Sequence, residues 1–355
     1  MKRVVLTGGG TAGHVTPNMA LIPILREKGY DIHYIGSYDG IEKKLMEDMG
    51  IPYHGISTGK LRRYFNVKNF SDPFRVIKGL SEAKHLMKEL QPDVVFSKGG
   101  FVAVPVVLAA HSKHIPIICH ESDMTPGLAN RIAIPKASRV CCNFPETVES
   151  LPKGKATVTG TPIRQELFNG DAAAAMTFCG FKEIRPTLLI IGGSSGSVRV
   201  NEAVWSCIED ITKKYNVIHL CGKGKMNDSY KNVPNYVQFE YIKQELANLL
   251  ALSDVVVSRA GANAICELLA LRKPSVLIPL SLEASRGDQI LNAQSFAKSG
   301  YSKLLMEEDV NEASLIDAIN EVYDNRDIYI KAMECSSTTD SITLITDMID
   351  ELANR

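Results

Sequence analysis

Three glycine-rich loops, each directly after a short apolar run, are the first candidates for chemistry in this chain. They are residues 8–13 (GGGTAG), 97–101 (SKGGF) and 192–197 (GGSSGS). Glycine lets the backbone turn sharply and come close to a ligand. The helix predicted after each loop offers unpaired N–H groups and a positive dipole end. The loops therefore favour an anionic ligand shared by two α/β halves of the chain.

The spacing of the glycines discriminates between known phosphate-binding patterns. None of the loops matches G-x-x-x-x-G-K-[ST], which argues against phosphoryl transfer by a P-loop. Gly8, Gly10 and Gly13 fit the dinucleotide-binding spacing. The acidic residue expected about 20 residues further on is missing from residues 35–38, and Asp39 lies just beyond. The pattern therefore disfavours a dehydrogenase.

Two side chains beside such turns could act on a substrate. His14 stands where the first loop becomes a helix, so it is either a helix-terminal hydrogen-bonding group or a general base, because its ordinary pKa lies near working pH. The dipole of that helix should disfavour the charged imidazole. Glu267 follows the small-residue turn at 258–262 on a predicted helix. A carboxylate there can accept both hydroxyls of a ribose, the alternative being a solvated helical glutamate.

The composition limits the classes of protein to which this chain can belong. The 355 residues suffice for two domains, and 40 basic against 40 acidic residues argue against a general nucleic-acid binder. No apolar run approaches the ~20 residues of a membrane span, and the N-terminus shows no signal-peptide core. Eight cysteines without C-x-x-C spacing favour reduced, buried thiols in a cytosolic protein over disulfides or a metal site.

Strands and helices alternate along the first half of the chain, which predicts a doubly wound α/β domain. Each predicted strand is a short apolar or β-branched run, typical of a parallel sheet that is covered on both faces. The predicted strands are residues 3–6, 32–35, 94–96, 115–119, 140–143 and 156–159, and the predicted helices are 15–28 and 41–49.

A second alternating run follows the motif at 160–164, where the interdomain linker is expected. Its predicted strands are 188–191, 217–220, 237–241, 255–258, 276–279 and 303–305, and its predicted helices are 198–214, 246–252, 262–271 and 288–298. The alanine run at 172–175 is interpreted as an exposed turn. The predicted fold class is α/β, with two doubly wound parallel-sheet domains. They comprise residues 1–162 and 163–338, and an amphipathic helix at about 339–355 packs back on the first.

Residues 60–90 form a basic segment with interleaved aromatic residues. Such a segment suits an anionic membrane surface. The alternative is that the aromatic residues enter the core while the lysines solvate a helix. We favour that alternative for Lys84 and Lys88, and both interpretations stay open for residues 61–74. The residues proposed to contact a membrane are Leu61, Arg62, Arg63, Phe65, Phe70 and Phe74.

Seven motifs, in order and covering nearly the whole chain, resemble those of the MurG family of cell-wall N-acetylglucosaminyltransferases. They are residues 8–17, 98–105, 120–130, 160–164, 192–197, 258–267 and 288–293, and HESDMTPGLAN at 120–130 is the most specific. The resemblance implies a GT-B fold of two Rossmann-like domains with a deep cleft. It also implies transfer of N-acetylglucosamine from UDP-N-acetylglucosamine to the 4-hydroxyl of the muramoyl sugar of lipid I. The products are lipid II and UDP, with inversion at the anomeric carbon.

The resemblance assigns most donor-binding roles to the second half of the chain. Ile242 corresponds to a position whose backbone pairs with uracil, Glu267 to a ribose-binding glutamate and Gln289 to a glutamine that contacts the sugar. Arg164 corresponds to a linker arginine near the donor. Asp288 departs from the glutamine that many members have. The implied donor-binding residues are Thr11, Gly13, Arg164, Ser194, Ser195, Gly196, Ile242, Arg259, Gly261, Ala262, Asn263, Glu267, Asp288 and Gln289.

The acceptor is expected at the first half. Inversion requires one displacement, in which a base removes the proton of the attacking hydroxyl. His14 is the expected base and Asp123, which is asparagine in some members, is its rival. Loop 192–197 should stabilise the leaving UDP. Phe101 stands where others have tyrosine, which excludes a hydroxyl-dependent role there. The implied acceptor and diphosphate loops contain Gly10, Thr11, Gly99, Gly100 and Phe101.

No cofactor is expected, since the sequence shows no Asp-x-Asp pair to hold a metal. The expected partners are UDP-N-acetylglucosamine, lipid I, the anionic inner leaflet of the cytoplasmic membrane and other cell-wall synthesis or division proteins, but no nucleic acid. The expected location is peripheral, on the cytoplasmic side of that membrane. Three alternatives are another GT-B transferase with a different acceptor, a nucleotide-sugar epimerase, and a non-enzymatic nucleotide- or lipid-binding protein.

Overall fold

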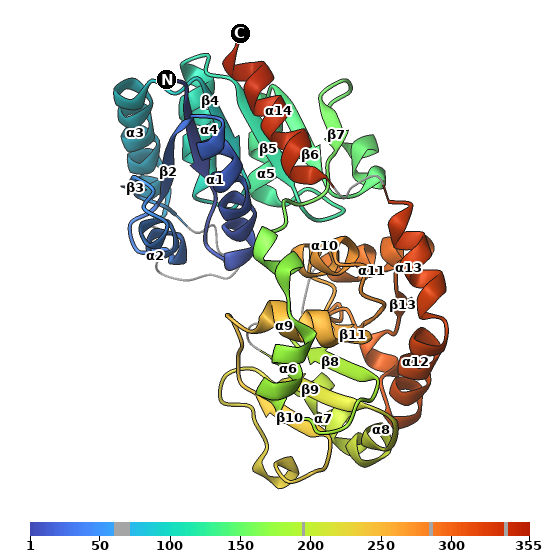
Figure 1. Ribbon diagram of the computed structural model, residues 1–355. Coiled ribbons are helices and arrows are strands. Elements are labelled where there is room, and N and C mark those ends of the chain that lie inside the picture. The colour runs from blue at the N-terminus through green and yellow to red at the C-terminus, as the bar shows by residue number, and fades with distance from the viewer. Residues whose placement is uncertain (60–71, 194–195, 284–286, 337–339) are drawn as a thin grey trace. The chain divides into compact units, whose positions relative to one another are not determined.

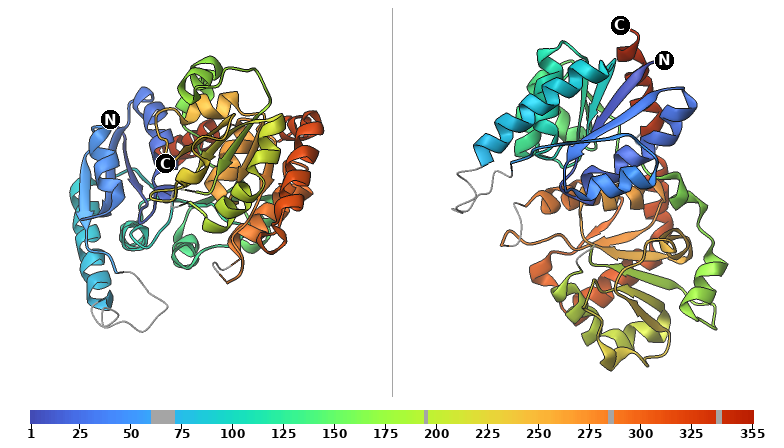
Figure 2. Two further views of the ribbon diagram at one scale, coloured as in Figure 1. Left: turned by 90° about the horizontal axis from the view of Figure 1, so that it is seen from below. Right: turned by 90° about the vertical axis from the view of Figure 1, so that its left-hand side faces the viewer.

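The computed structural model describes residues 1–59, 72–193, 196–283, 287–336 and 340–355, which form two compact units. Unit 1 comprises Met1–Arg164 and Asp340–Arg355, and unit 2 comprises Gln165–Thr339. Each unit is built on its own parallel sheet (Figures 1 and 2). Some predicted site residues lie outside the described residues, namely Leu61, Arg62, Arg63, Phe65, Phe70, Ser194 and Ser195.

The described part of unit 1 contains a seven-stranded parallel sheet in the order β3-β2-β1-β4-β5-β6-β7. The strands are β1 (Arg3–Thr7), β2 (Asp31–Ser37), β3 (Tyr53–Ile56), β4 (Val94–Ser97), β5 (Ile117–Glu121), β6 (Arg139–Cys142) and β7 (Ala156–Val158). β3 was not predicted. The strand order reverses between β1 and β4, where Thr7 is paired with Ser97. Ligands of doubly wound sheets bind outside such a switch point, and the first two glycine loops leave from it.

Helices cover both faces of this sheet. Val4 and Leu6 pack against α1 and α14, whereas Val5 packs against α3 and α4, because successive strand residues face opposite sides. Figure 1 shows the red α14 beside the blue α1, from opposite ends of the chain. The helices are α1 (Thr16–Glu27), α2 (Ile41–Asp48), α3 (Asp72–Leu90), α4 (Ala103–Ser112), α5 (Leu128–Ala133) and α14 (Ser341–Ala353), with a 3-10 turn η1 (Ala12–His14).

The described part of unit 2 contains a six-stranded parallel sheet in the order β10-β9-β8-β11-β12-β13. The strands are β8 (Thr187–Ile191), β9 (Asn216–Leu220), β10 (Tyr236–Phe239), β11 (Val255–Ser258), β12 (Ser275–Leu277) and β13 (Lys303–Leu304). The order reverses between β8 and β11, where Ile191 is paired with Ser258. The third glycine loop and the turn at 258–262 therefore leave the sheet side by side.

The helices of unit 2 correct two predictions. The alanine run at 172–175 begins a helix rather than a turn, because the Asp171 carboxylate accepts hydrogen bonds from Ala173 and Ala174 and Gly180 ends the helix in the left-handed conformation. The helix predicted at 198–214 is broken at Cys207. The helices are α6 (Ala172–Cys179), α7 (Val198–Ser206), α8 (Ile208–Lys214), α9 (Leu246–Leu252), α10 (Ala262–Ala270), α11 (Asp288–Lys298), α12 (Glu312–Asp324) and α13 (Arg326–Glu334), after a 3-10 turn η5 (Gln165–Asn169).

The structure shows the state of the cysteines and whether a described helix could span a membrane. All eight cysteines are free thiols, and six of them are buried. Burial raises the pKa of the Cys119, Cys141 and Cys142 thiols to about 12, so they stay protonated at neutral pH. Among the described residues, no helix is both long and apolar enough to span a bilayer.

Candidate active site

The first two glycine loops pack against each other at the switch point of unit 1. The Lys98 amide donates a hydrogen bond to the Thr7 carbonyl at 2.9 Å. Gly100 has a φ of +84°, and a Cβ atom on it would lie 2.4 Å from the Gly9 carbonyl oxygen and 3.3 Å from Cδ2 of His14. Because the near atom is backbone, only glycine allows this approach. Glycine at position 100 is therefore required for the two loops to make this contact.

His14, at the end of η1, is half-buried and has a defined tautomer. Its Nδ1 lies 3.2 Å from the Lys98 carbonyl oxygen. Since a carbonyl only accepts, Nδ1 carries the proton and Nε2 keeps a lone pair. Burial and the positive charge of Lys98 lower the pKa of His14 to about 4. The imidazole is thus neutral at pH 7, in the direction that the sequence predicted, with burial rather than the helix dipole as the main cause.

Lys98 is a buried lysine that the sequence analysis did not single out. Its Nζ donates to Nδ1 of His120 at 2.9 Å and also to Oγ of Ser122. Nε2 of His120 must then carry the proton, and it donates to the Gly160 carbonyl at 2.9 Å. Burial and the charge of Lys98 hold the pKa of His120 well below its usual range. This network joins the ends of β4 and β5 to Gly160.

The stretch at 120–130 is shaped by the buried carboxylate of Glu121. Its oxygens accept hydrogen bonds from the backbone amides of Asp123 at 3.0 Å and Gly127 at 3.1 Å, and from Nδ2 of Asn130 at 2.9 Å. Burial raises the pKa of Glu121. A Cβ on Gly99 would lie 3.1 Å from Oδ1 of Asn130. The loop that presents the half-exposed Asp123 is therefore fixed next to the second glycine loop.

Glu42, which the sequence analysis also missed, holds the first glycine loop from α2. Its side chain is fully buried. Oε1 accepts from the amide of Ser37 at 3.0 Å and from Oγ of Ser37 at 2.6 Å, while Oε2 lies 3.4 Å from the Gly10 amide. A Cβ on Gly9 would lie 2.6 Å from this carboxylate. The sequence offered no signal for this role, because Glu42 is one of two glutamates on a short helix rich in charged residues.

In unit 2 the third glycine loop runs into α7. Gly193 and Gly196 have φ values of +86° and +67°, and a Cβ on Gly196 would lie 1.9 Å from the Cys221 carbonyl oxygen. Oγ of Ser197 caps α7 by accepting from the Val200 amide at 3.3 Å. The loop therefore presents the N-terminal end of a nine-residue helix, with its positive dipole end, at the edge of the sheet.

Two of the pockets that the described residues form adjoin each other at this edge, because both are lined by Ile191, Gly193, Ser258 and Ala264. The first, of about 580 Å³, collects the predicted residues Gly196, Arg259, Gly261 and Gln289. The second, of about 220 Å³, is mainly apolar and brings Ile242 and Glu267 together.

The other predicted donor residues that the structure describes are not among the lining of these two pockets. Ala262 and Asn263 open α10, and Asp288 opens α11. Thr11, Gly13 and Arg164 belong to unit 1.

Comparison with known proteins shows the family. Residues 4–142 match the glycosyltransferase family 28 N-terminal domain, and residues 187–348 match its C-terminal domain. Relatives from Lachnospira eligens and Lachnoclostridium phytofermentans are each 62% identical over 99% of both chains. Both are named UDP-N-acetylglucosamine–N-acetylmuramyl-(pentapeptide) pyrophosphoryl-undecaprenol N-acetylglucosamine transferase. The chain belongs to the MurG family.

The solved structures agree with this assignment. The crystal structure of MurG from Acinetobacter baumannii is 25% identical, with a TM-score of 0.79 over 99% of this chain and 100% of that one. The predicted resemblance and the predicted GT-B class of two Rossmann-like domains are both confirmed.

Arg259 of this MurG-family chain is only 8% exposed, and its guanidinium is largely engaged within unit 2. It donates to the carbonyls of Ile278 at 3.1 Å and Pro279 at 3.2 Å, to Oγ of Ser197 at 2.5 Å, and to the carboxylate of Glu307. Although burial opposes the effect, the Arg259 guanidinium and the Ser281 amide lower the pKa of Glu307. Arg259 therefore ties the turn after β11 to the glycine loop, and much of its charge is neutralised.

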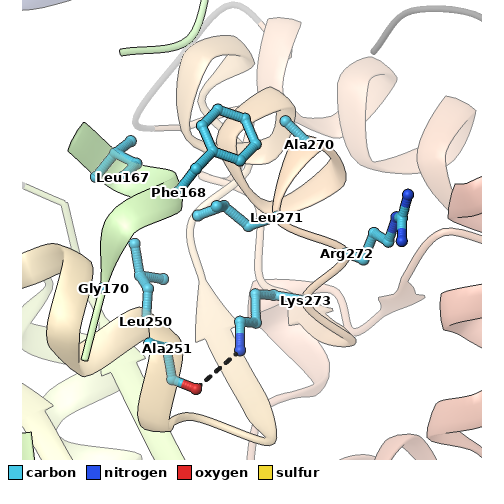
Figure 3. A pocket seen from close by; sticks show the side chains of 9 residues that line it. All are labelled: Leu167, Phe168, Gly170, Leu250, Ala251, Ala270, Leu271, Arg272 and Lys273. Atoms are coloured by element: carbon cyan, nitrogen blue, oxygen red, sulfur yellow. Dashed lines mark hydrogen bonds between the residues drawn. The ribbon is translucent and has the colours of Figure 1, made fainter. Parts of the chain in front are cut away.

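A further pocket, of about 430 Å³, contains none of the predicted site residues (Figure 3). Its lining includes Leu250 and Ala251 near the end of α9 and Ala270 at the end of α10. The Lys273 ammonium donates to the Ala251 carbonyl at 3.3 Å. Helix C-terminal ends repel anions. Of the two cations in the lining, Lys273 already binds carbonyls and Arg272 is paired with Glu334 at 3.1 Å. This pocket is therefore unsuited to a diphosphate, unlike the pair beside the glycine loop.

The contact between the glycine loops gives a test with a matched control. Gly100→Ala places its Cβ against the Gly9 carbonyl, whereas Gly154→Ala, at a similar φ of +76°, meets nothing within 4 Å. Both variants bear the strain of a positive φ, so the difference isolates the contact. We expect Gly100→Ala to lose roughly 1–3 kcal/mol more free energy of unfolding than Gly154→Ala, measured by urea denaturation. Equal losses of unfolding free energy in the two variants would show that the loops can move apart at little cost in free energy.

Proposed function

We propose that this chain transfers N-acetylglucosamine from UDP-N-acetylglucosamine to lipid I, giving lipid II and UDP in peptidoglycan synthesis. Its 62% identical relatives bear the name of that transferase. The observation that carries the proposal at the level of residues lies in unit 2. There, a mainly apolar pocket that contains the half-exposed carboxylate of Glu267 and the exposed one of Glu240 adjoins a larger pocket lined by a glycine loop. A uridine and its diphosphate need these two environments side by side.

In this proposal the uridine occupies the smaller pocket. The Glu267 carboxylate accepts hydrogen bonds from the ribose hydroxyls, and the backbone at Ile242 pairs with uracil. The diphosphate lies in the larger pocket, against the amides of the loop at Gly196 and the N-terminal ends of α7 and α10. Oε1 of Gln289 accepts from the Leu280 amide at 3.1 Å. Its amide nitrogen therefore remains to donate to a hydroxyl of the sugar.

The base in this proposal is His14. Its Nε2 lone pair removes the proton of the 4-hydroxyl of the muramoyl sugar while that oxygen bonds to the anomeric carbon. The bond from that carbon to the UDP oxygen breaks in the same step. The helix ends at the larger pocket stabilise the negative charge that develops on UDP. A diphosphate held by the loops of unit 1 would offset the field of Lys98, so acceptor binding would raise the pKa of His14 and strengthen the base.

Asp123 remains the rival base. Its loop follows β5, next to β4 in the sheet, and Glu121 fixes its backbone amide. His14 is favoured because the tautomer defined by the Lys98 carbonyl leaves a lone pair on Nε2. Under this assignment Asp123 binds the acceptor.

We also propose that the chain acts at the cytoplasmic face of the membrane as a peripheral protein, and that the segment 61–74 touches the anionic leaflet. Phe74, the last residue of that segment, and Ile77, near the start of α3, are 77% and 66% exposed, which supports an apolar contact there. Other proteins of cell-wall synthesis or division are further proposed partners. Because helix ends supply the proposed stabilisation of UDP, we expect the reaction to need no metal.

The reaction itself is tested with purified protein, labelled UDP-N-acetylglucosamine and a lipid I analogue, with and without EDTA. Disaccharide product and UDP that depend on the acceptor would support the proposal, and equal rates in EDTA would support a metal-free reaction. Consumption of the UDP-sugar without acceptor would instead indicate hydrolysis or epimerisation. Transfer to other acceptors but not to the analogue would contradict the proposed acceptor.

The ribose role of Glu267 predicts a loss of donor affinity. Glu267→Ala should weaken UDP binding roughly 10- to 100-fold, because a hydrogen bond to a charged group contributes about 1.5–3 kcal/mol. Isothermal titration with UDP and with 2′-deoxy-UDP measures this directly. The wild type should prefer UDP, and the variant should lose that preference. Glu202→Ala, an exposed glutamate on α7, is the control. A preference that survives in Glu267→Ala would refute the assignment.

The base role of His14 predicts a loss of turnover. His14→Ala should lower kcat roughly 10²- to 10⁴-fold with little change in the KM of the donor. In the wild type, kcat/KM should fall only as pH drops through about 4, because His14 is neutral above that pKa. This acid limb should vanish in the variant. His111→Ala, at an exposed histidine, should retain both kcat and the limb. Unchanged turnover in His14→Ala would transfer the role to Asp123.

The membrane proposal predicts weaker binding to anionic vesicles when the charges of two arginines are reversed. Each basic residue near such a surface contributes about 1 kcal/mol, so Arg62→Glu with Arg63→Glu should reduce binding roughly tenfold or more. Vesicle co-sedimentation measures this, and activity on a short soluble lipid I analogue should be spared. The control, Lys223→Glu with Lys231→Glu, makes the same charge change at exposed sites of unit 2. Equal losses of vesicle binding in both variants would show that binding depends on net charge and not on the position of the two arginines.

A further inference from the structure

We infer that Lys98 is a positioning residue for the base: its carbonyl fixes which nitrogen of His14 carries the proton, and its buried ammonium places a fixed positive charge beside the imidazole. The inference rests on the proposed role of His14 and adds to it the group that prepares the base. It starts from a cation buried beside the histidine that has to accept a proton.

The first step concerns where the ammonium is held. Lys98 is 1% exposed, so its charge is removed from water, which is costly unless hydrogen bonds compensate. Its Nζ reaches Nδ1 of His120 at 2.9 Å and Oγ of Ser122, and His120 is held in turn by the Gly160 carbonyl. The ammonium is therefore fixed in place rather than free to follow a ligand.

The second step concerns the main chain of the same residue. The Lys98 amide donates to Thr7 at 2.9 Å, so its peptide unit is fixed at the end of β4. The carbonyl of that residue then accepts from Nδ1 of His14 at 3.2 Å. Because this carbonyl is held in place and can only accept, Nδ1 of His14 carries the proton and Nε2 is left as the proton acceptor.

The third step concerns the charges that face His14. Among the residues that the structure describes, they come from two elements: the ammonium of Lys98, at the end of β4, and the carboxylate of Glu42, on α2. Burial and Lys98 lower the pKa of His14, and Glu42 raises it in opposition. Glu42 is itself tied to Ser37 and to the Gly10 amide. The protonation of the base is thus set first by burial and then by two fixed charges of opposite sign.

The opposite signs make the inference testable without an activity assay. In the full-length protein with isotope-labelled histidine, NMR titration follows the pKa of His14, which His14→Gln identifies by the missing signal. Lys98→Met removes the charge, and Lys98→Gln removes it while keeping a donor for His120. We expect both to raise the pKa of His14 from about 4 toward its ordinary 6.5. Glu42→Gln should lower it further.

Ser122→Ala is the matched control, because it removes one contact of the ammonium and leaves the charge. The pKa of His14 should not move in it, and the acid limb of kcat/KM should move only in the variants that change charge. An unchanged pKa in folded Lys98→Met or Lys98→Gln would overturn the inference, since a merely structural lysine would leave the titration of His14 alone.

The two hypotheses fail in different ways. If the pKa of His14 rises in Lys98→Gln while the acid limb of kcat/KM stays in place, Lys98 controls a histidine that is not the base. That result would overturn the proposed function of His14 and the catalytic meaning of Lys98 together. If His14→Ala abolishes turnover but neither Lys98 variant shifts the titration, the base assignment stands and only the inference about Lys98 falls.

Discussion

Both candidate sites depend on the pairing of strands at a point where the order of a parallel sheet reverses. β1 lies against β4 in unit 1, and β8 lies against β11 in unit 2. In a parallel sheet the carboxyl ends share one edge, so loops that leave paired strands must meet. Gly100 faces the backbone of Gly9 at a distance that leaves no room for a Cβ. Gly196 is equally close to Cys221, which follows β9, the other strand paired with β8. The glycines are therefore required by the strand pairing before any ligand is considered.

The two units handle charge at this edge differently. Unit 1 buries the ammonium of Lys98 and the carboxylates of Glu42 and Glu121, and each is bonded to loop backbone or to a fixed side chain. Such burial costs free energy that only well-made hydrogen bonds offset. The result is a set of loops already shaped before any ligand arrives, which lowers the ordering cost of binding. In unit 2 the buried Arg259 is paired with Glu307, so less charge is left for the ligand.

Features that depend on neighbouring residues could be predicted from the sequence, whereas features that depend on contacts between distant residues could not. Strands such as β1 and β8 are short apolar runs, and the glycine loops and family motifs are local, so the fold class and the family were predicted and are confirmed. β3 was missed because its sequence, Tyr-His-Gly-Ile, is not an apolar run. α6 was taken for a turn although Asp171 and Gly180 mark its two ends. The roles of Lys98 and Glu42 arise from contacts 22 and 32 residues apart, for which a single sequence gives no signal.

The departure at Asp288 fits the division of charge within unit 2. As the first residue of α11, it places a carboxylate at a helix N-terminus, where the dipole stabilises it. That carboxylate offsets the positive end that a phosphate would otherwise seek. Within the proposed donor site, the diphosphate then belongs to α7 and α10, which have no acidic residue in their first turns. The neutral Gln289 beside Asp288 is left to face the sugar. Under that proposal, a chain with glutamine at 288 would hold more positive potential at α11 while keeping the same loop at Gly196. We therefore expect the substitution to change where the donor's charge is balanced rather than whether the donor binds.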